Sequence, residues 1–376
     1  MRTQTIMLEE LCGKGSSSLM QRDVTKGDGI YPVYGASGLI GYIDTYKQEN
    51  EYIGIVKDGA GVGRVFVLPK KSSVIGTMQY LLPKKGVDVR YLYHALTFLD
   101  LGKYCTGATI PHIYYRDYKK ELLPFYSMED QVIIGGKLDS VLELIKKRRE
   151  QLHELDNLVK SQFIEMFGDI VRNDKGWSCE CIEQVAPAEP YRGQIASFNG
   201  KYWLLNLDMV ESQTGEIISK VMVDLSEIGN STMTFGVENV LYSKLRPYLN
   251  KVVIPTESGY ATSELIPLKP NPGKLNKYYF ASALRSDAFV GYIQEQVAGA
   301  KMPRVSMGVF RAFLIPCPPM KLQEQFARFV DQTDKSKVLG KKQKYYLFLL
   351  KNAILTIKTM VNKSKISYNI MKEDVI

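Results

Sequence analysis

Two long stretches of the chain place apolar residues at alternating steps of three and four among charged ones. The first covers about residues 127–167, and its apolar positions are Leu138, Leu142, Ile145, Leu152, Val159, Phe163 and Met166. The second covers about residues 320–362 and repeats the spacing in Leu347, Leu350, Ile354, Ile357 and Val361. This spacing is typical of the seam of a coiled coil, and about forty helical residues span roughly 60 Å. The pattern predicts two long helices that pair as an antiparallel coiled coil.

Each seam contains residues that do not fit it. Arg149 and Asp156 interrupt the first, and Gly340 is expected to weaken the second, because glycine disfavours helix. The acidic pair Glu129 and Asp130 suits the positive end of the first helix dipole. These features leave both helices in place but predict a less regular second one.

The remaining sequence has short apolar runs separated by glycine, proline and asparagine, which is typical of mixed strands and loops. Shorter helices are expected near residues 89–101 and 277–296. The chain is therefore predicted to be α+β, with two mixed α/β domains alternating with two long helices. The expected boundaries are 1–126 for the first domain, 127–168 for the central helix, 169–318 for the second domain, 319–363 for the C-terminal helix and 364–376 for a tail.

A repeated motif precedes both helices. Residues 107–113 and 299–305 both read Gly-Ala-x-apolar-Pro-basic-apolar and lie 192 residues apart. Leu-Leu-Pro at 122–124 matches Leu-Ile-Pro at 314–316 with the same offset. Residues 128–131 then match residues 322–325, after a slip of two positions. Several matching features in one order predict an internal duplication with pseudo-two-fold symmetry.

Composition narrows the class of partner. The formal charge of +9 and the pI near 9.0 favour a polyanionic partner. A run without any carboxylate carries many of the cations: Lys335, Lys337, Lys341, Lys342, Lys344, Lys351, Lys358, Lys363 and Lys365. A solvated helix face and a contact with phosphates or an acidic partner both remain open for this run.

Location and metal content follow from what the sequence lacks. No stretch has the roughly 18 consecutive apolar residues of a membrane span, and no signal-peptide pattern opens the chain, so a cytoplasmic location is expected. The five cysteines are scattered and never spaced as Cys-x-x-Cys. Neither a disulfide framework nor a metal site is expected.

Residues 244–248 combine side chains suited to reading DNA. Arg246 offers a planar fork for guanine or phosphate, Lys244 a second cation, and Tyr248 an aromatic face, while Pro247 restrains the backbone. The alternative is a strand end in which Tyr248 belongs to the core and Arg246 pairs with a carboxylate.

Two further segments carry candidate DNA contacts. Lys301 and Arg304 occupy the second copy of the repeated motif, where the first copy has Thr109 and His112. This asymmetry would suit two domains that read different sequences, although a solvated turn is the alternative for the second copy. Lys57 and Arg64 flank a glycine-rich segment that continues into a strand, so it is interpreted as a tight hairpin with phosphate-facing rims.

Catalytic motifs are not found. The Asn/Asp-Pro-Pro-aromatic signature of amino-methyltransferases is missing, and Asn271-Pro272-Gly273 is interpreted as a turn. Gly13-Lys14-Gly15-Ser16 lacks the upstream glycine of a phosphate-binding loop. The sequence therefore predicts a chain without a catalytic site of its own.

These features together resemble the specificity subunits of type I restriction-modification systems. The resemblance rests on the order and duplication of its motifs, which are Tyr-Pro-Val-Tyr-Gly at 31–35, Lys-Asp-Gly-Ala-Gly-Val-Gly at 57–63, the repeated motif at 107–112 and 299–304, the junction at 158–169, and Val-Leu-Tyr-Ser-Lys-Leu-Arg-Pro-Tyr-Leu-Asn at 240–250. It covers nearly the whole chain. Tyr34 joins the candidate DNA contacts on this ground.

The resemblance implies two target-recognition domains, two spacer helices and a bipartite double-stranded DNA target. It also implies modification subunits that dock on the spacer helices, and restriction subunits in the full complex. S-adenosylmethionine is expected in the modification subunits and no cofactor in this chain. The alternatives are the recognition arm of a system with a fused modification-cleavage polypeptide, and a coiled-coil adaptor that binds protein.

Overall fold

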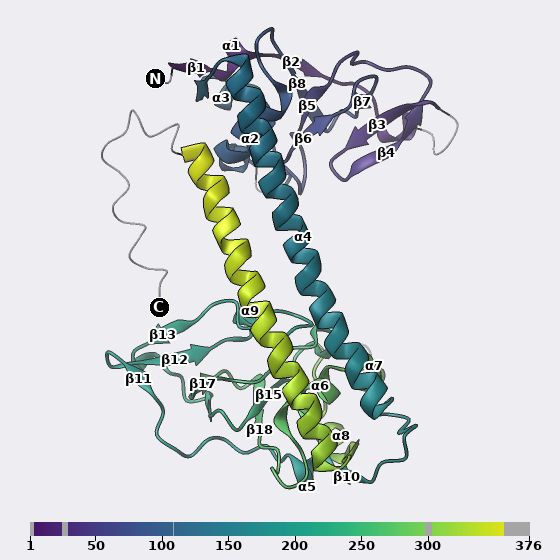
Figure 1. Ribbon diagram of the computed structural model, residues 1–376, viewed down its shortest axis with the longest axis vertical. Coiled ribbons are helices and arrows are strands. Elements are labelled where there is room, and N and C mark those ends of the chain that lie inside the picture. The colour runs from purple at the N-terminus through teal and green to yellow at the C-terminus, as the bar shows by residue number, and fades with distance from the viewer. Residues whose placement is uncertain (1–3, 25–28, 108, 298–302, 357–376) are drawn as a thin grey trace. The chain divides into compact units, whose positions relative to one another are not determined.

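The computed structural model describes residues 4–24, 29–107, 109–297 and 303–356 (Figure 1). The chain divides into two compact units, one formed by residues 1–149 and 342–376 and the other by residues 150–341. Both units mix strands with helices, as the sequence predicted. The predicted end of the second long helix, at 363, and the tail at 364–376 lie outside the described residues.

The first unit is built on an antiparallel four-stranded sheet in the order β2-β8-β5-β6, beside a three-stranded sheet and a strand pair. Its strands are β1 (Gln4–Met7), β2 (Cys12–Ser16), β3 (Tyr31–Gly35), β4 (Gly38–Ile43), β5 (Tyr52–Val56), β6 (Val65–Leu68), β7 (Ser73–Val74), β8 (Met78–Pro83) and β9 (Leu122–Phe125). Its short helices are α1 (Leu8–Leu11), α2 (Val89–Leu99) and α3 (Tyr115–Tyr118).

The central strand β5 is buried along its whole length, which suits its run of β-branched and aromatic residues. Helix α2 begins at the N-cap Asp88, whose carboxylate accepts a hydrogen bond from the Tyr91 amide at 2.8 Å. The apolar face of α2 then buries Leu92 and Leu96 in the same core as Ile53 of β5.

The second unit has a five-stranded sheet, a three-stranded sheet in the order β16-β15-β18, and a pair formed by β10 and β19. Its strands are β10 (Cys179–Cys181), β11 (Ser197–Phe198), β12 (Lys201–Leu205), β13 (Val221–Val223), β14 (Met233–Phe235), β15 (Val240–Ser243), β16 (Val252–Val253), β17 (Gly259–Ala261), β18 (Leu265–Leu268) and β19 (Leu314–Pro316). Its short helices are α5 (Ile182–Val185), α6 (Lys277–Arg285), α7 (Asp287–Glu295) and α8 (Met307–Ala312).

The single helix predicted near residues 277–296 is divided in two. Ser286 has extended backbone angles, and its hydroxyl accepts a hydrogen bond from the Phe289 amide at 3.3 Å. Serine competes with helical backbone bonding in this way and is a preferred N-cap. The division lets both α6 and α7 bury aromatic residues, Tyr279 and Phe289 among them, in one core.

The two long helices are α4 (Met128–Phe167) and α9 (Met320–Thr356). In the second unit the end of α4 packs against the start of α9, since the rings of Phe163 and Phe326 lie 5.5 Å apart. Further along, Asp156 pairs with Lys337 at 2.7 Å. Early residues of one helix meet late residues of the other, so these halves run antiparallel, and one seam interruption is explained as an ion pair.

Gly340 does not break α9, which continues to Thr356. A Cβ atom at Gly340 would lie 3.2 Å from a Leu152 methyl group of α4. This separation is tighter than most contacts, so the glycine allows a close approach of the two helices. Gly340 is therefore expected to lower the stability of the helix itself, but it permits close packing of α9 against α4.

The strand registers of the two units correspond residue by residue. In β5 and β8, Ile53 faces Leu81; adding 187 to both numbers gives Val240 facing Leu268 in β15 and β18. The same shift converts the β5–β6 register into that of β15 and β16. The pair β1 and β9 likewise corresponds to β10 and β19.

The starts of the long helices correspond with an offset of 192 and no slip. Gln131 and Gln323 are fully buried and make equivalent hydrogen bonds, whereas Gln325 is exposed. The two-residue slip expected from the sequence is therefore wrong. Two residues correspond to about 200° around a helix, so a slip would carry the glutamine to the other face.

Candidate nucleic-acid interface

Each unit has a hairpin turn at one end of its central strand. The first hairpin turn (residues 57–63) joins β5 to β6, and the second hairpin turn (residues 244–250) joins β15 to β16. The shift of 187 that relates the strands also relates these turns, which have equal length. Lys57 and Lys244 are thus counterparts, and Gly59 is the counterpart of Arg246.

A short segment from the repeated motif is bonded to each turn. In the first unit, Lys57 O accepts from Ile113 N at 3.0 Å and Gly59 N donates to Pro111 O at 2.9 Å. In the second unit, Lys244 O accepts from Val305 N at 2.8 Å and Arg246 N donates to Pro303 O at 2.8 Å. The repeated motif thus holds the same two backbone positions of each hairpin turn.

The first hairpin turn is closed by its own backbone. Val62 N donates to Gly59 O at 3.1 Å, and Gly63 N donates to Val56 O at 3.0 Å. Arg64 is exposed, and its Nε donates to Gly61 O at 3.4 Å. The tight hairpin predicted from the glycines is confirmed.

The second hairpin turn is held in a less common backbone conformation. Arg246 and Asn250 have φ angles of 49° and 50°, in the left-handed region, and Pro247 between them is buried. Leu249 N donates to Arg246 O at 2.9 Å, which gives a short 3₁₀ turn. A non-glycine residue at positive φ is uncommon and persists where the surroundings impose it.

The structure contradicts both parts of the alternative interpretation of residues 244–248. Tyr248 is 41% exposed, so it does not belong to the core. Within the described part of the chain, no carboxylate pairs with Arg246, and its Nε is enclosed without a hydrogen-bond partner. The structure therefore leaves the Arg246 guanidinium with donors that the described residues do not fully use.

A carboxylate instead pairs with the basic residue of each repeated motif. Arg304 contacts Glu264 through Nη2 at 3.0 Å and Nε at 3.5 Å, and the Arg304 side chain is 57% exposed. In the first unit, His112 Nδ1 contacts Asp58 Oδ1. The Arg304 side chain is exposed, whereas the His112–Asp58 contact is partly buried at the first hairpin turn; in both, an acidic side chain orients the basic one.

The remaining predicted residues are placed as follows. Thr109 is exposed, close in sequence to the segment that holds the first turn. Tyr34 lies on β3 and packs in part against a core cluster that includes Tyr52, and burial raises the pKa of its hydroxyl. Lys301 lies outside the described residues.

A loop that the sequence did not single out supports the second hairpin turn. Gln213 donates from its backbone to Leu249 O at 3.0 Å and from Nε2 to Tyr248 O at 3.0 Å. Asn250 Nδ2 donates to Gln213 Oε1 at 3.3 Å and to Arg285 O at 2.9 Å. Burial lowers the pKa of Arg285 to about 10, and its guanidinium donates to Val252 O of β16.

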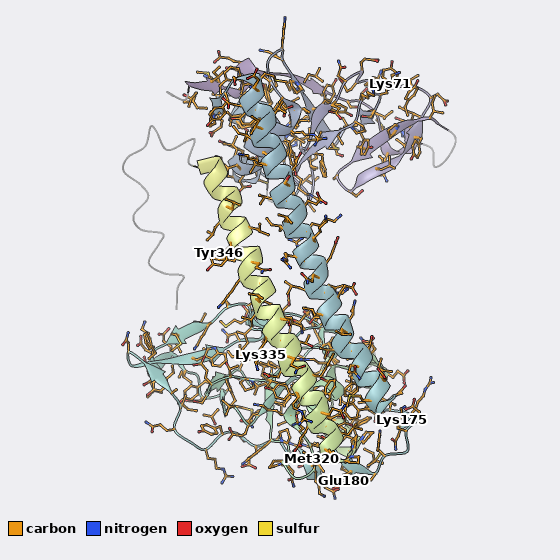
Figure 2. The ribbon with its side chains drawn as sticks, in the orientation of Figure 1. Lys71, Lys175, Glu180, Met320, Lys335 and Tyr346 are labelled. Carbon is orange, nitrogen blue, oxygen red and sulfur yellow. The ribbon has the colours of Figure 1, made fainter. Side chains whose placement is uncertain are left out.

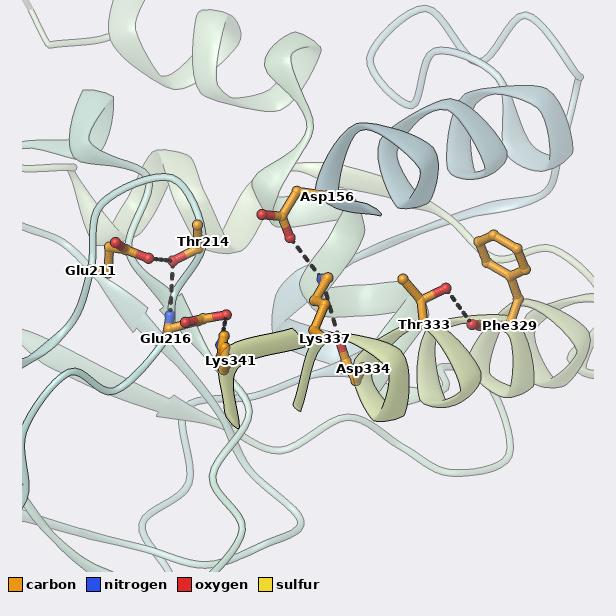
Figure 3. A network of polar contacts seen from close by, with 9 residues as sticks. All are labelled: Asp156, Glu211, Thr214, Glu216, Phe329, Thr333, Asp334, Lys337 and Lys341. Carbon is orange, nitrogen blue, oxygen red and sulfur yellow. Dashed lines mark hydrogen bonds and ion pairs between the residues drawn. The ribbon is translucent and has the colours of Figure 1, made fainter. Parts of the chain in front are cut away.

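The same loop reaches helix α9, as Figure 3 shows. Glu216 contacts Lys341 Nζ, and its backbone N–H donates to Thr214 Oγ1 at 3.2 Å. Lys337 of α9 lies between Asp156 and Asp334, at 2.7 and 3.2 Å. The second hairpin turn is thus linked to the long helix through residues 213–216.

These ion pairs also resolve part of the lysine-rich run. Lys337 is only 13% exposed, and Lys335, labelled in Figure 2, pairs with Asp331 at 2.7 Å. At least three of the lysines are therefore partnered by carboxylates within the second unit. Lys337 is therefore largely withdrawn from solvent, whereas Lys335, which is 75% exposed, lies on a solvated face.

A sequence signal exists for the predicted lysines of the two turns, but not for the residues that were missed. Lys57 and Lys244 each follow a strand, and the turns after them are equally long. Gln213 and Glu264 carry no comparable signal, because their roles arise from contacts between segments 35 to 40 residues apart.

Across residues 4–24, 29–107, 109–297 and 303–356, no helix combines the length and apolar content required to cross a membrane.

Comparison with known proteins agrees with the resemblance noted in the sequence. The family model of the type I restriction modification DNA specificity domain matches residues 3–154. The specificity subunit of the type I restriction enzyme EcoDI from Escherichia coli is 20% identical over 368 residues, which cover 88% of this chain and 80% of that protein. The EcoprrI specificity subunit, also from Escherichia coli, is 26% identical over 116 residues, covering 29% of this chain and 27% of that protein.

A solved structure shares the fold. The S subunit of a type I restriction-modification system from M. genitalium aligns with a TM-score of 0.59 at 14% identity, and the alignment covers 95% of this chain and 96% of that one. Residues 3–154 thus match the type I restriction modification DNA specificity domain, the chain is similar over most of its length to the EcoDI specificity subunit, and it shares the fold of a solved S subunit.

Proposed function

We propose that the chain reads a bipartite double-stranded DNA target, with one half-site for each hairpin turn and its supporting motif. The main support for this proposal is that equivalent backbone hydrogen bonds hold two turns that carry different residues at the same position, Gly59 in one and Arg246 in the other. A constant frame with variable tips is what a protein needs to read two different sequences with one architecture. The two units are interpreted as copies of an internal duplication related by a pseudo-two-fold axis.

The candidate contacts divide by their chemistry. Arg246 and Arg304 have guanidinium forks suited to guanine or phosphate, and Tyr248 adds an exposed ring. Lys57, Lys244 and Arg64 are suited to phosphates, whereas Thr109, His112, Tyr34 and Lys301 complete the set expected from the sequence. The second domain therefore offers more guanidinium groups than the first.

The long helices are proposed to act as a spacer between the domains. The antiparallel contacts of α4 with α9 in the second unit support a coiled coil along their length. Inserting one helical turn into α4 should change the gap between half-sites and leave the half-sites themselves unchanged. An unchanged gap would contradict the spacer role.

Modification subunits are proposed to dock on these helices, and restriction subunits to join them in the full complex. Apolar side chains stand exposed on α9, as the labelled Tyr346 illustrates in Figure 2; they include Val338, Leu339, Tyr345, Tyr346, Phe348, Leu349 and Leu350. Exposed apolar surface of this kind marks interaction sites. In this proposal the modification subunits bind S-adenosylmethionine, and this chain carries no catalysis and acts in the cytoplasm.

Sequencing of methylated bases across the genome, with and without the gene for this chain, tests the proposal. Loss of one bipartite methylated motif is expected. An unchanged methylation pattern would contradict it. The alternatives are an arm of a fused modification-cleavage system and a coiled-coil adaptor, and the matches favour neither of them.

A further inference from the structure

A buried glutamine near the start of α4 joins three backbone groups of the first unit. Gln131 Oε1 accepts from Asp88 N at 2.9 Å. Its Nε2 donates to Gly86 O at 3.0 Å and to Tyr126 O at 2.8 Å. The side chain is fully buried. It therefore ties the N-cap of α2, the loop before α2 and the entry into the long helix to one another.

A second glutamine makes the same set of bonds in the other unit. Gln323 Oε1 accepts from Asn276 N at 2.8 Å, and Nε2 donates to Lys274 O at 2.9 Å and Pro318 O at 2.7 Å. Asn276 is the N-cap of α6, as Asp88 is of α2. The arrangement thus occurs twice in one chain, between segments whose other residues differ.

A carboxamide is suited to this position. It provides one acceptor and two donor hydrogens in a single plane, so one side chain can satisfy an N–H group and two carbonyl groups. A tyrosine adds a second tie in each unit, because Tyr91 Oη donates to Pro124 O at 2.5 Å and Tyr279 Oη donates to Pro316 O at 2.8 Å. Buried, directional bonds of this kind restrict the angle between a helix and its domain.

We propose that Gln131 and Gln323 are positioning residues that fix the direction in which each long helix leaves its domain, and that they thereby set how strictly the gap of the DNA target is measured. This inference rests on the proposed bipartite reading. One added base pair shifts a half-site by about 3.4 Å and turns it by about 35°. A domain that can tilt on its helix tolerates such a change, whereas a pinned one does not.

The test uses the complex of the full chain with its modification subunits and a pool of duplexes randomised in sequence. Sequences that bind are selected and read for their half-sites and gap. For the unaltered chain, the native gap should exceed gaps one base pair longer or shorter by about tenfold or more. In Gln131→Met and in Gln323→Met, which fill the site without its hydrogen bonds, this preference should fall to about threefold or less, with the half-sites unchanged.

Matched controls separate pinning from loss of stability. Leu138→Ala and Val330→Ala remove buried apolar groups from the same two helices and leave the glutamines in place. These two variants should select the native gap as strictly as the unaltered chain does. Because the same bonds recur in the second unit, Gln323→Met provides the result if Gln131→Met does not fold.

Three outcomes decide the matter. The inference is overturned if the glutamine variants select the native gap as strictly as the unaltered chain does. It is also overturned if the control variants lose this preference to the same extent as the glutamine variants. If the unaltered complex selects no bipartite sequence, the proposed function fails, and the inference fails with it for that distinct reason.

Discussion

The two hairpin turns share a backbone frame and differ in how they are supported. The first turn closes on itself through Gly59 and Gly63, while the second depends on Gln213 and on left-handed residues at Arg246 and Asn250. Equivalent strands and equivalent bonds therefore carry turns that differ in their supporting contacts and in their charge. This comparison shows that the frame is independent of the sequence at its tip, which is the property that variable recognition requires.

The largest expected difference between the units lies where the long helices meet the domains. Phe326 is the counterpart of Ile134 by the offset of 192, and it packs among aromatic rings that include Phe163 and Phe167. Phe326→Ala should lower the free energy of unfolding of the second unit by about 3–5 kcal/mol, and Ile134→Ala that of the first by about 2–4 kcal/mol. Denaturant unfolding followed separately in each unit measures both losses; a larger loss for Ile134→Ala would break the comparison.

The next prediction gives the second hairpin turn the residue that the first turn has at the equivalent position. Arg246→Gly makes the second turn resemble the first and should weaken DNA binding by about 1–3 kcal/mol, with specificity relaxed at one position of one half-site. If Arg246 contacts only phosphate, binding should fall equally for all sequences and the dependence on salt should become shallower. Titrations against single-base variants of the target at two salt concentrations distinguish these results. No change of either kind would remove Arg246 from the interface.

A substitution at the equivalent position of the first turn is its control. Gly59 has a φ of 89°, and a Cβ built there meets no atom within 4 Å, so Gly59→Asn has room and uses a residue that tolerates left-handed angles. This variant should leave the second half-site unaffected. Altered selectivity at that half-site would contradict the assignment of one turn to each half-site.

A smaller effect should be equal in both units. Tyr91→Phe and Tyr279→Phe each remove a hydroxyl that donates to a proline carbonyl, and each should cost about 1–2 kcal/mol of unfolding free energy. The two losses should agree within about 0.5 kcal/mol, as expected for a shared frame. Clearly unequal losses, measured by thermal or chemical denaturation, would show that the two units share the geometry of this hydrogen bond but not its contribution to stability.

The smallest effect concerns the link between α9 and the 213–216 segment. Lys341 and Glu216 are 45% and 36% exposed, so Lys341→Ala should change stability by about 0–1 kcal/mol. Its effect on DNA affinity should be confined to the second half-site, because Gln213 in the same loop bonds the second turn. A loss of affinity for the first half-site would contradict that route.

The sequence by itself determined the two long helices, the repeated motif and the resemblance to type I specificity subunits. Each of these signals is local: apolar spacing reports helical phase, and the Gly-Ala-x-x-Pro motif and the tight glycine hairpin report their own backbone. The role of Glu129 and Asp130 at the start of α4 can also be predicted from the sequence, because they act within the first turn of the helix.

Only the tertiary structure decided which segments are counterparts. Residues 57–63 and 244–250 share little beyond their first lysine, yet strand register and backbone bonds make them equivalent, because a β-ladder pairs main-chain groups whatever the side chains. Helical phase placed Gln323, rather than Gln325, in the position of Gln131. The pairing of Lys337 with Asp156 and of Arg304 with Glu264 was likewise decided by packing, since each of these carboxylates lies in a distant segment of the chain.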